Sequence, residues 1–284
     1  MKNFISNEST YSPIQPGFAI NLPKYNEIKP HQKLLQNNIS YFYEIITSTE
    51  ELKSIPIIPD GCMDIIFVID ENSIIPYLIG TASSLVGLDA SSNKEIFGIR
   101  FYPGGLNSFF PLMANEINSS QIPLELLCNK SHNLSQEIIN ASSFESRISI
   151  IESFFCKEIL NSNGKEILIQ YCVDKIISTN GTITINTLSE NTGYSTRYIN
   201  KLFNEYIGFS PKNFCEIVRL QSTIEYIRKH NNYTLTSVSN VYGYYDQSHM
   251  NKDFNKFLNI TSGYIYDNTF FYANQLNLSN VYSF

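Results

Sequence analysis

The 284-residue sequence contains no tryptophan and only four histidines, and its 20 Lys and Arg residues are outnumbered by 26 Asp and Glu residues. A net charge of −6 excludes a protein that binds nucleic acid through an overall positive surface. No run approaches the ~20 apolar residues of a membrane span, and residues 1–10 lack the basic start and long apolar stretch of a signal peptide. We therefore expect a cytoplasmic protein with no membrane contact.

The cysteines are too few and too scattered for a structural framework. They are separated by long stretches and form no C-x-x-C pair: Cys62, Cys128, Cys156, Cys172 and Cys215. This spacing argues against a zinc cluster and against a dense set of disulfides, and predicts reduced, buried thiols. The first 160 residues contain only two histidines, His31 and His132, so we expect neither a metal site nor another cofactor.

Chain length and charge distribution indicate two domains. A chain of 284 residues exceeds what one hydrophobic core usually organises. Residues 1–164 contain 10 Lys and Arg against 17 Asp and Glu, a net charge of −7, whereas residues 165–284 contain 10 against 9, a net charge of +1. Any DNA binding by the second half must therefore depend on the local placement of its cations and on good base contacts.

The first part of the chain has the pattern of a β-rich unit. Short apolar runs broken by Pro, Gly and Asn predict strands at 39–47, 63–70, 74–80 and 95–105. A longer period then predicts helices at 119–127 and 142–160. With NSNGK, residues 161–165, as the linker, we expect a sensor and dimerisation domain over residues 1–160 and a second domain over residues 166–284.

Helical periodicity dominates the second domain. KEILIQYCVDKIIS predicts one helix, and a short helix follows before a turn at Gly193. Ser195 is placed to cap the next helix, and Gly208 can end it in the left-handed conformation. Ser210 and Pro211 then predict the cap and the first position of a helix that runs to about residue 229.

This pattern is duplicated. GYSTRYINKLFNEYIGFS, residues 193–210, recurs as GYYDQSHMNKDFNKFLNIT, residues 243–261. With one extra residue in the second turn, the copies match in cap, apolar seam and cation: Ser195 with Asp246, Ile199 with Met250, Asn200 with Asn251, Lys201 with Lys252 and Phe203 with Phe254. A repeat of about 50 residues with these matches indicates two copies of one helix-turn-helix module joined by a long helix.

In a helix-turn-helix the second helix enters the major groove of DNA. The residues opposite the apolar seam are Thr196, Arg197, Asn200 and Lys201 in the first copy and Gln247, Ser248, Asn251 and Lys252 in the second. Arg and Lys can donate to guanine, Asn and Gln can bond adenine bidentately, and Ser can bond a base or a phosphate. The alternative is that all eight are only the solvated faces of two helices, but their duplication in register favours DNA reading.

Residues 165–265 resemble the double helix-turn-helix DNA-binding domain of the AraC/XylS family of bacterial transcription regulators. The resemblance is carried by GYSTRYINKLFNEYIGFSPKNF, EIVRLQSTIEYI and LTSVSNVYGYYDQSHMNKDF. It implies that the outward residues other than Thr196 read bases in successive major-groove segments on one side of the duplex. The sequence departs from the family pattern at Asn259, where Gly is usual, at Ser262, where Pro is usual, and at Glu216, where a basic residue is common.

The segments IPDGCMDIIF and GIRFYPGG resemble the β-rich N-terminal domain of uncharacterised role that precedes this module in some family members. The resemblance implies a small cupin-like barrel that senses a ligand, dimerises or does both. Arg100, on a predicted strand, either faces solvent, forms a structural ion pair, or faces inward and holds an anionic ligand. Asp60 and Asp64 could act as acid and base, but we expect Asp60 to start a turn and Asp64 to point outward.

The helix predicted at 142–160 carries an apolar stripe that is either core or dimer seam: Phe144, Ile148, Ile151, Phe154, Phe155 and Ile159. The sequence as a whole predicts an α+β protein that is not an enzyme, with a cupin-like sensor domain and an all-α double helix-turn-helix domain. Its function would be transcription activation at promoter DNA under a small-molecule or protein effector. RNA polymerase and a second copy of the chain are left open as partners. The alternative function is that of an interaction protein whose degenerate helix-turn-helix binds a protein instead of DNA.

Overall fold

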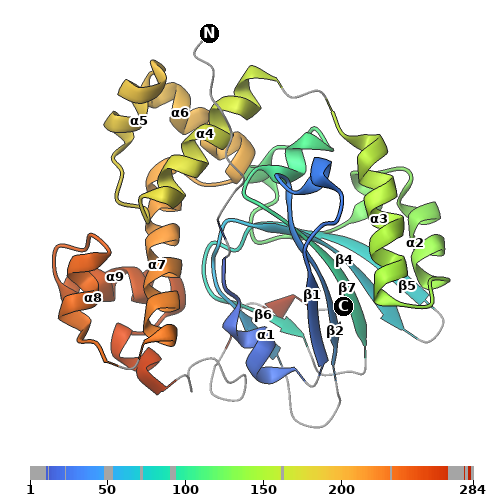
Figure 1. Ribbon diagram of the computed structural model, residues 1–284, viewed down its shortest axis with the longest axis horizontal. Helices are drawn as coiled ribbons and strands as arrows, with labels where there is room; N and C mark the ends of the chain where they lie inside the picture. Colours follow the sequence, from blue (N-terminus) through green and yellow to red (C-terminus); the bar gives the residue numbers. More distant parts are fainter. Residues whose placement is uncertain are drawn as a thin grey trace.

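The computed structural model describes residues 11, 13–22, 24–47, 54–70, 73–89, 94–160, 163–230, 232–267, 278 and 281–282. Two β-sheets form its first half, and helices form its second half (Figure 1). This confirms the predicted α+β class, with a β-rich part followed by a helical part, in which the short strand Val281–Tyr282 departs from the all-α prediction. Most of residues 266–284 lies outside the described residues.

The larger sheet has six antiparallel strands. In spatial order they are β1 (Lys24–Ile28), β2 (Ile39–Ile46), β7 (Glu95–Phe101), β4 (Met63–Asp70), β5 (Ser73–Ile79) and β8 (Gln121–Pro123). The four strands predicted from the sequence are thereby confirmed as β2, β4, β5 and β7.

The helix predicted at 119–127 is wrong. Residues Gln121–Pro123 pair with β5 instead, and only a 3-10 turn, Leu124–Leu126, follows them. The apolar spacing of this segment is compatible with a helix, but Pro123 has no N–H to donate and disfavours the helical conformation of the residue before it.

The smaller sheet contains β3 (Ser54–Ile57), β6 (Val86–Asp89) and β9 (Val281–Tyr282), in that order. Alternate residues of β2, β4 and β7 point toward it and form a core between the two sheets, beside helix α1 (Pro16–Asn21). The smaller sheet thus buries the inner face of the larger one, and both faces of the central strands are covered.

Two helices cover the other face of the larger sheet, α2 (Ser131–Ile139) and α3 (Phe144–Glu158) (Figure 1). The apolar stripe of α3 packs on Phe97, Phe101 and Phe109 of the chain's own β-rich half. Of the two alternatives for this stripe, the structure thus shows core packing.

The second half contains six helices within the described residues. They are α4 (Gly164–Ser178), α5 (Ile185–Thr192), α6 (Thr196–Ile207), α7 (Pro211–Lys229), α8 (Leu235–Val241) and α9 (Gln247–Leu258). α4 is capped by Asn163 and begins inside the predicted linker, of which residues 161–162 lie outside the description. None of the helices in the described part of the chain is long and apolar enough to span a membrane.

The two halves share one hydrophobic core. Residues of the β-rich half, among them Ile58, Cys62 and Leu85, are buried in the same cluster as the apolar seams of α4, α6, α7 and α9. Gly61 marks one tight contact between the halves, because a Cβ atom at this position would lie 2.7 Å from the Phe214 ring. Its φ of +79° also belongs to the left-handed region.

We expect Gly61→Ala to lower the free energy of unfolding by more than about 1 kcal/mol, because the new methyl group meets both an unfavourable φ and the Phe214 ring. Thermal unfolding measures the effect. Gly164→Ala is the matched control, since a Cβ atom there has no neighbour within 4 Å, and its Tm should stay close to that of the wild type. Equal Tm values for the two variants would contradict the tight contact.

Candidate nucleic-acid interface

The first helix-turn-helix is formed by α5 and α6. α5 ends at Gly193, whose φ of +78° lies in the left-handed region, and the Ser195 hydroxyl then accepts a hydrogen bond from the Tyr198 amide. Ile199 and Phe203 of α6 are fully buried. The cap and the seam predicted for this helix are confirmed, so its opposite face is turned outward.

The second helix-turn-helix, α8 and α9, repeats this construction. Gly243 has a φ of +71°, and the Asp246 carboxylate caps α9 by accepting from the His249 amide at 2.7 Å. Met250 and Phe254 are fully buried, in the positions of Ile199 and Phe203. Residues that are paired in the sequence repeat therefore occupy equivalent positions in the two helix-turn-helix modules.

The predicted reading residues fall into an exposed and a half-buried group. The exposed residues are Arg197, Lys201, Gln247, Ser248 and Lys252, and the half-buried ones are Thr196, Asn200 and Asn251. The Asn200 amide donates to the Thr196 carbonyl at 2.8 Å, and Lys201 lies 3.6 Å from Glu205. The most accessible cations on the two reading helices are therefore Arg197, Lys201 and Lys252.

Asn251 has a structural contact that the sequence did not reveal. Its side-chain oxygen accepts hydrogen bonds from both the backbone amide and the hydroxyl of Ser262, at 2.9 and 2.7 Å. Asn259 adopts the left-handed conformation, with a φ of 58°, as expected for a replacement of Gly. Because Ser262 is anchored by Asn251, the missing Pro does not leave this turn loose. Only the amide N–H₂ of Asn251 remains for a base.

Two other cations, on α7 and α9, are paired with acids. Arg219 of α7 pairs with Asp253 of α9 at 3.0 Å and lies over the ring of Tyr244. Lys256 binds Glu216 at 2.6 Å, so the acid that departs from the family pattern is neutralised within the chain. These contacts hold α9 on α7.

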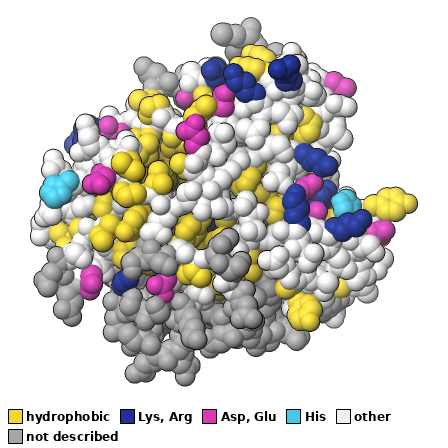
Figure 2. All heavy atoms as spheres, turned by 180° about the vertical axis from the view of Figure 1, so that it is seen from behind, with side chains coloured by type: hydrophobic (Ala, Val, Ile, Leu, Met, Phe, Trp, Pro, Cys, Tyr) yellow, Lys and Arg dark blue, Asp and Glu magenta, His cyan; other side chains and the backbone are white. Residues whose placement is uncertain are grey.

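Two exposed tyrosines were not singled out from the sequence. Tyr245, directly before the cap of α9, is 90% exposed, and Tyr194 at the equivalent turn is 44% exposed and stacks on Tyr198. A tyrosine hydroxyl can bond a phosphate oxygen at the edge of a reading helix. Figure 2 shows Lys and Arg side chains, mixed with acidic ones, at the top and right margin, the side on which the helical half lies.

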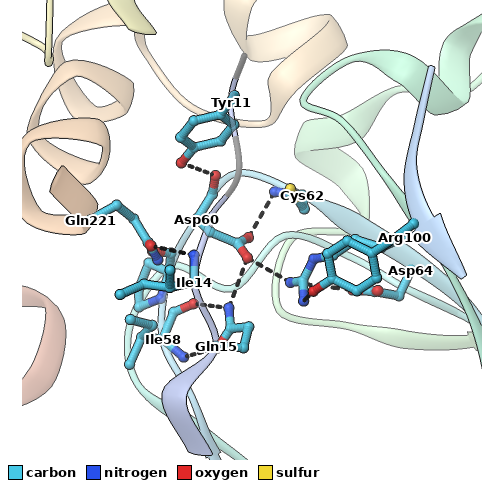
Figure 3. Close-up of polar contacts among 11 residues, drawn as sticks. Tyr11, Ile14, Gln15, Ile58, Asp60, Cys62, Asp64, Arg100 and Gln221 are labelled. Carbon is cyan, nitrogen blue, oxygen red and sulfur yellow. Dashed lines mark hydrogen bonds and ion pairs between the residues drawn. The ribbon is translucent and has the colours of Figure 1, made fainter. Parts of the chain in front are cut away.

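A buried polar network connects the helical half to the β-rich half (Figure 3). Asp60 is 3% exposed and starts the expected turn, with its carboxylate accepting from the Cys62 amide at 2.9 Å. The same carboxylate accepts from Gln15 at 2.7 Å and from Arg100 at 2.6 Å. Arg100 also donates to the Tyr41 hydroxyl at 3.1 Å.

The network reaches the helical half through Gln221 of α7. Its side-chain oxygen accepts from the Ile14 amide at 3.0 Å, and its N–H₂ donates to the Pro59 carbonyl at 2.8 Å. Gln221 is 3% exposed and lies opposite the Asp60 turn in Figure 3. The helix that joins the two helix-turn-helix modules is therefore held by the turn that Asp60 forms.

Asp64 does not point outward as expected. It faces the space between the sheets, 3.6 Å from Arg100, because both faces of β4 are covered. Burial raises its pKa to about 6, with Asp60 adding to the shift and Arg100 opposing it. Burial also raises the pKa of the Cys62 thiol well above its ordinary value, the opposite of what a nucleophile requires.

Arg100 faces inward and forms a structural ion pair, one of the alternatives drawn from the sequence. An anionic ligand at Arg100 would have to compete with Asp60 and Asp64, both already within 4 Å of its guanidinium group. In the described part of the chain, no group of three or more His, Cys, Asp or Glu side chains could hold a metal ion.

Comparison with known proteins identifies the two parts of the chain separately. A family model described as a helix-turn-helix domain matches residues 188–263, and one described as a domain of unknown function matches residues 26–123. No curated protein matches the sequence.

Among solved structures, the chain is similar to ToxT from Vibrio cholerae, with a TM-score of 0.41 and 13% identity over 79% of this chain and 98% of that chain. ToxT bound to an unsaturated fatty acid gives a TM-score of 0.39 and 12% identity, over 79% and 95%. A likeness of this size implies neither a ligand nor a function for this chain.

Asp64 should make stability depend on pH. Between pH 3.8, the ordinary pKa of the group, and about pH 6, the pKa in the folded state, the folded protein still carries a proton that the unfolded chain has lost. The stability that protonated Asp64 gives the folded state is fully present below the unfolded pKa and is lost as pH rises through the folded pKa. As pH rises from about 4 to about 7, the free energy of unfolding of Asp64→Asn should therefore increase by on the order of 1–3 kcal/mol relative to that of the wild type. Urea unfolding at several pH values measures this, and a constant difference would contradict it.

Gln221→Ala should cost about 1–3 kcal/mol of stability, because it leaves the buried Ile14 amide and Pro59 carbonyl without partners. Gln170→Ala is the control, since Gln170 bonds only to Asp174 on its own helix and should change stability by no more than about 0.5 kcal/mol. A cost at Gln221 no larger than at Gln170 would show that this contact between the halves is weak.

Proposed function

We propose, from the premise that residues 188–263 are an AraC-type helix-turn-helix domain, that this chain is a sequence-specific DNA-binding transcription regulator. α6 and α9 read successive segments of the major groove in promoter DNA, and the β-rich half controls them in response to a small-molecule or protein effector. The regulator acts as an activator, with RNA polymerase as a partner on the DNA.

One observation carries this proposal. Arg197 and Lys252 are exposed on two helices of the same construction, and neither has an ion-pair partner among the described residues. Arg219 and Lys256 nearby are both committed to acids. A helical half with a net charge of only +1 thus keeps free cations on the two faces that the repeat turns outward, where base edges and phosphates would lie.

Replacing Arg197 or Lys252 by Ala should weaken specific DNA binding by about 1–3 kcal/mol, which is about 5- to 150-fold in Kd. Fragments recovered by binding to the genome supply the DNA, and titration with fluorescent duplexes supplies the affinities. Lys157→Ala, at an exposed position of α3 in the other half, is the matched control and should bind like the wild type. Unchanged affinity and sequence preference in both reading-helix variants would remove these residues from the interface.

The second candidate is an interaction protein whose helical half binds a protein partner. The near-neutral charge of this half and the exposed Tyr245 favour it. Salt separates the two functions, because DNA affinity should fall steeply as the salt concentration rises, whereas an apolar protein contact should not weaken in this way.

Control by the β-rich half would pass through the buried joint between the halves. Gln221 lies on the helix that connects the two modules and bonds to both Ile14 and Pro59. A signal that moves the Asp60 turn would shift α7 and with it the spacing of α6 and α9, or would free the helical half. Arg100 as the anchor of an anionic effector stays a prediction, and its two carboxylate neighbours favour its structural role.

A further inference from the structure

The chain's last described residues return to the β-rich half. After α9 and the 3-10 segment Ser262–Asp267, β9 pairs in parallel with β6, with Val281 opposite Gly87 and Tyr282 opposite Leu88. Figure 1 shows this red strand beside β6, away from the helices that precede it. A Cβ atom on Gly87 would lie 2.9 Å from Leu278 and 3.2 Å from Val281, so the segment packs on bare backbone.

Tyr282 closes a cavity between the two sheets. Its side chain is 7% exposed and lines a cavity of about 20 Å³ together with Arg100, Asp64 and apolar side chains of both sheets. That volume has room for about one water molecule. Without the tyrosine ring, the same cavity would accept a small aromatic molecule.

The fit of Tyr282 in this cavity is incomplete. Its hydroxyl, Asp64 Oδ1 and Arg100 Nε are all buried and have no hydrogen-bond partner among the described residues. Unmet donors and acceptors in a low-dielectric site cost free energy. The apolar ring therefore holds the segment in place, while the polar corner of the cavity stays unused.

We propose that Tyr282 is a tethered internal ligand of the cavity between the sheets, and that a small hydroxylated aromatic molecule displaces it by bonding Asp64 and Arg100. A hydroxyl group suits this corner because it can donate to the Asp64 oxygen and accept from the Arg100 N–H. The tether gives Tyr282 a high effective concentration, so that a displacing molecule must make these additional bonds.

Displacement would release a link between the end of the helical half and the sheets. The inference deepens the control by the β-rich half proposed above and rests on it only for the effect on DNA. The test below measures occupancy of the cavity without DNA, so its failure would leave the DNA-binding proposal untouched, and failure of DNA binding would leave the cavity result untouched.

The experiment uses the full chain and two probes, p-cresol, which matches the tyrosine side chain, and catechol, which carries a second hydroxyl group. Hydrogen exchange of the C-terminal peptide in the wild type should be slow and should accelerate as catechol is added, because β9 leaves β6. Calorimetry of Tyr282→Ala should show catechol binding about tenfold tighter than to the wild type, because no ring competes for the cavity. Catechol should also bind this variant more tightly than p-cresol.

Two variants serve as controls. Tyr282→Phe keeps the ring and should keep the slow exchange, and Tyr245→Ala, at a 90% exposed position, should behave as the wild type does. The proposal is overturned by fast exchange of the wild-type segment, by equal catechol affinity of Tyr282→Ala and the wild type, or by equal affinity of that variant for the two probes. The wild-type exchange measurement decides the question even where Tyr282→Ala fails to fold.

Discussion

The contact on which the rest of this structure depends is the buried carboxylate of Asp60. It accepts from Arg100, from Gln15 and from its own turn at the Cys62 amide. A buried carboxylate is stable only when its oxygens are bonded in this way, and removing a partner would leave an uncompensated charge. The turn that it fixes offers the Pro59 carbonyl to Gln221 of α7 and brings Gly61 against Phe214. The contact between the β-rich half and α7 thus depends on the same few atoms.

The helical half has a near-neutral charge, and its cations differ in whether they are paired with acids. Arg219 and Lys256 hold α9 on α7 by pairing with Asp253 and Glu216. Arg197 and Lys252 remain available on the outward faces. In the proposed DNA complex such a surface would neutralise few phosphates, so affinity would come largely from base contacts and specificity from the spacing of α6 and α9.

The sequence predicts the helical half well because its signals are local. The caps at Ser195 and Ser210, the left-handed Gly208 and the duplicated apolar seam each depend on residues within a few positions of one another. The inward direction of Asp64 and the second role of Asn251 depend on partners distant in sequence or on a covering sheet, and no local pattern carries them. In the sequence Gln221 resembles any polar residue of a helix, and only the structure shows its two distant partners.

The pairing of β9 with β6 also determines when the smaller sheet can be completed during synthesis. β3 and β6 leave the ribosome long before Val281 and Tyr282, and until then β6 lacks its neighbour on that side. An unpaired strand edge is a template for association with other chains. The nascent protein therefore exposes this edge of β6 until Val281 and Tyr282 have been synthesised.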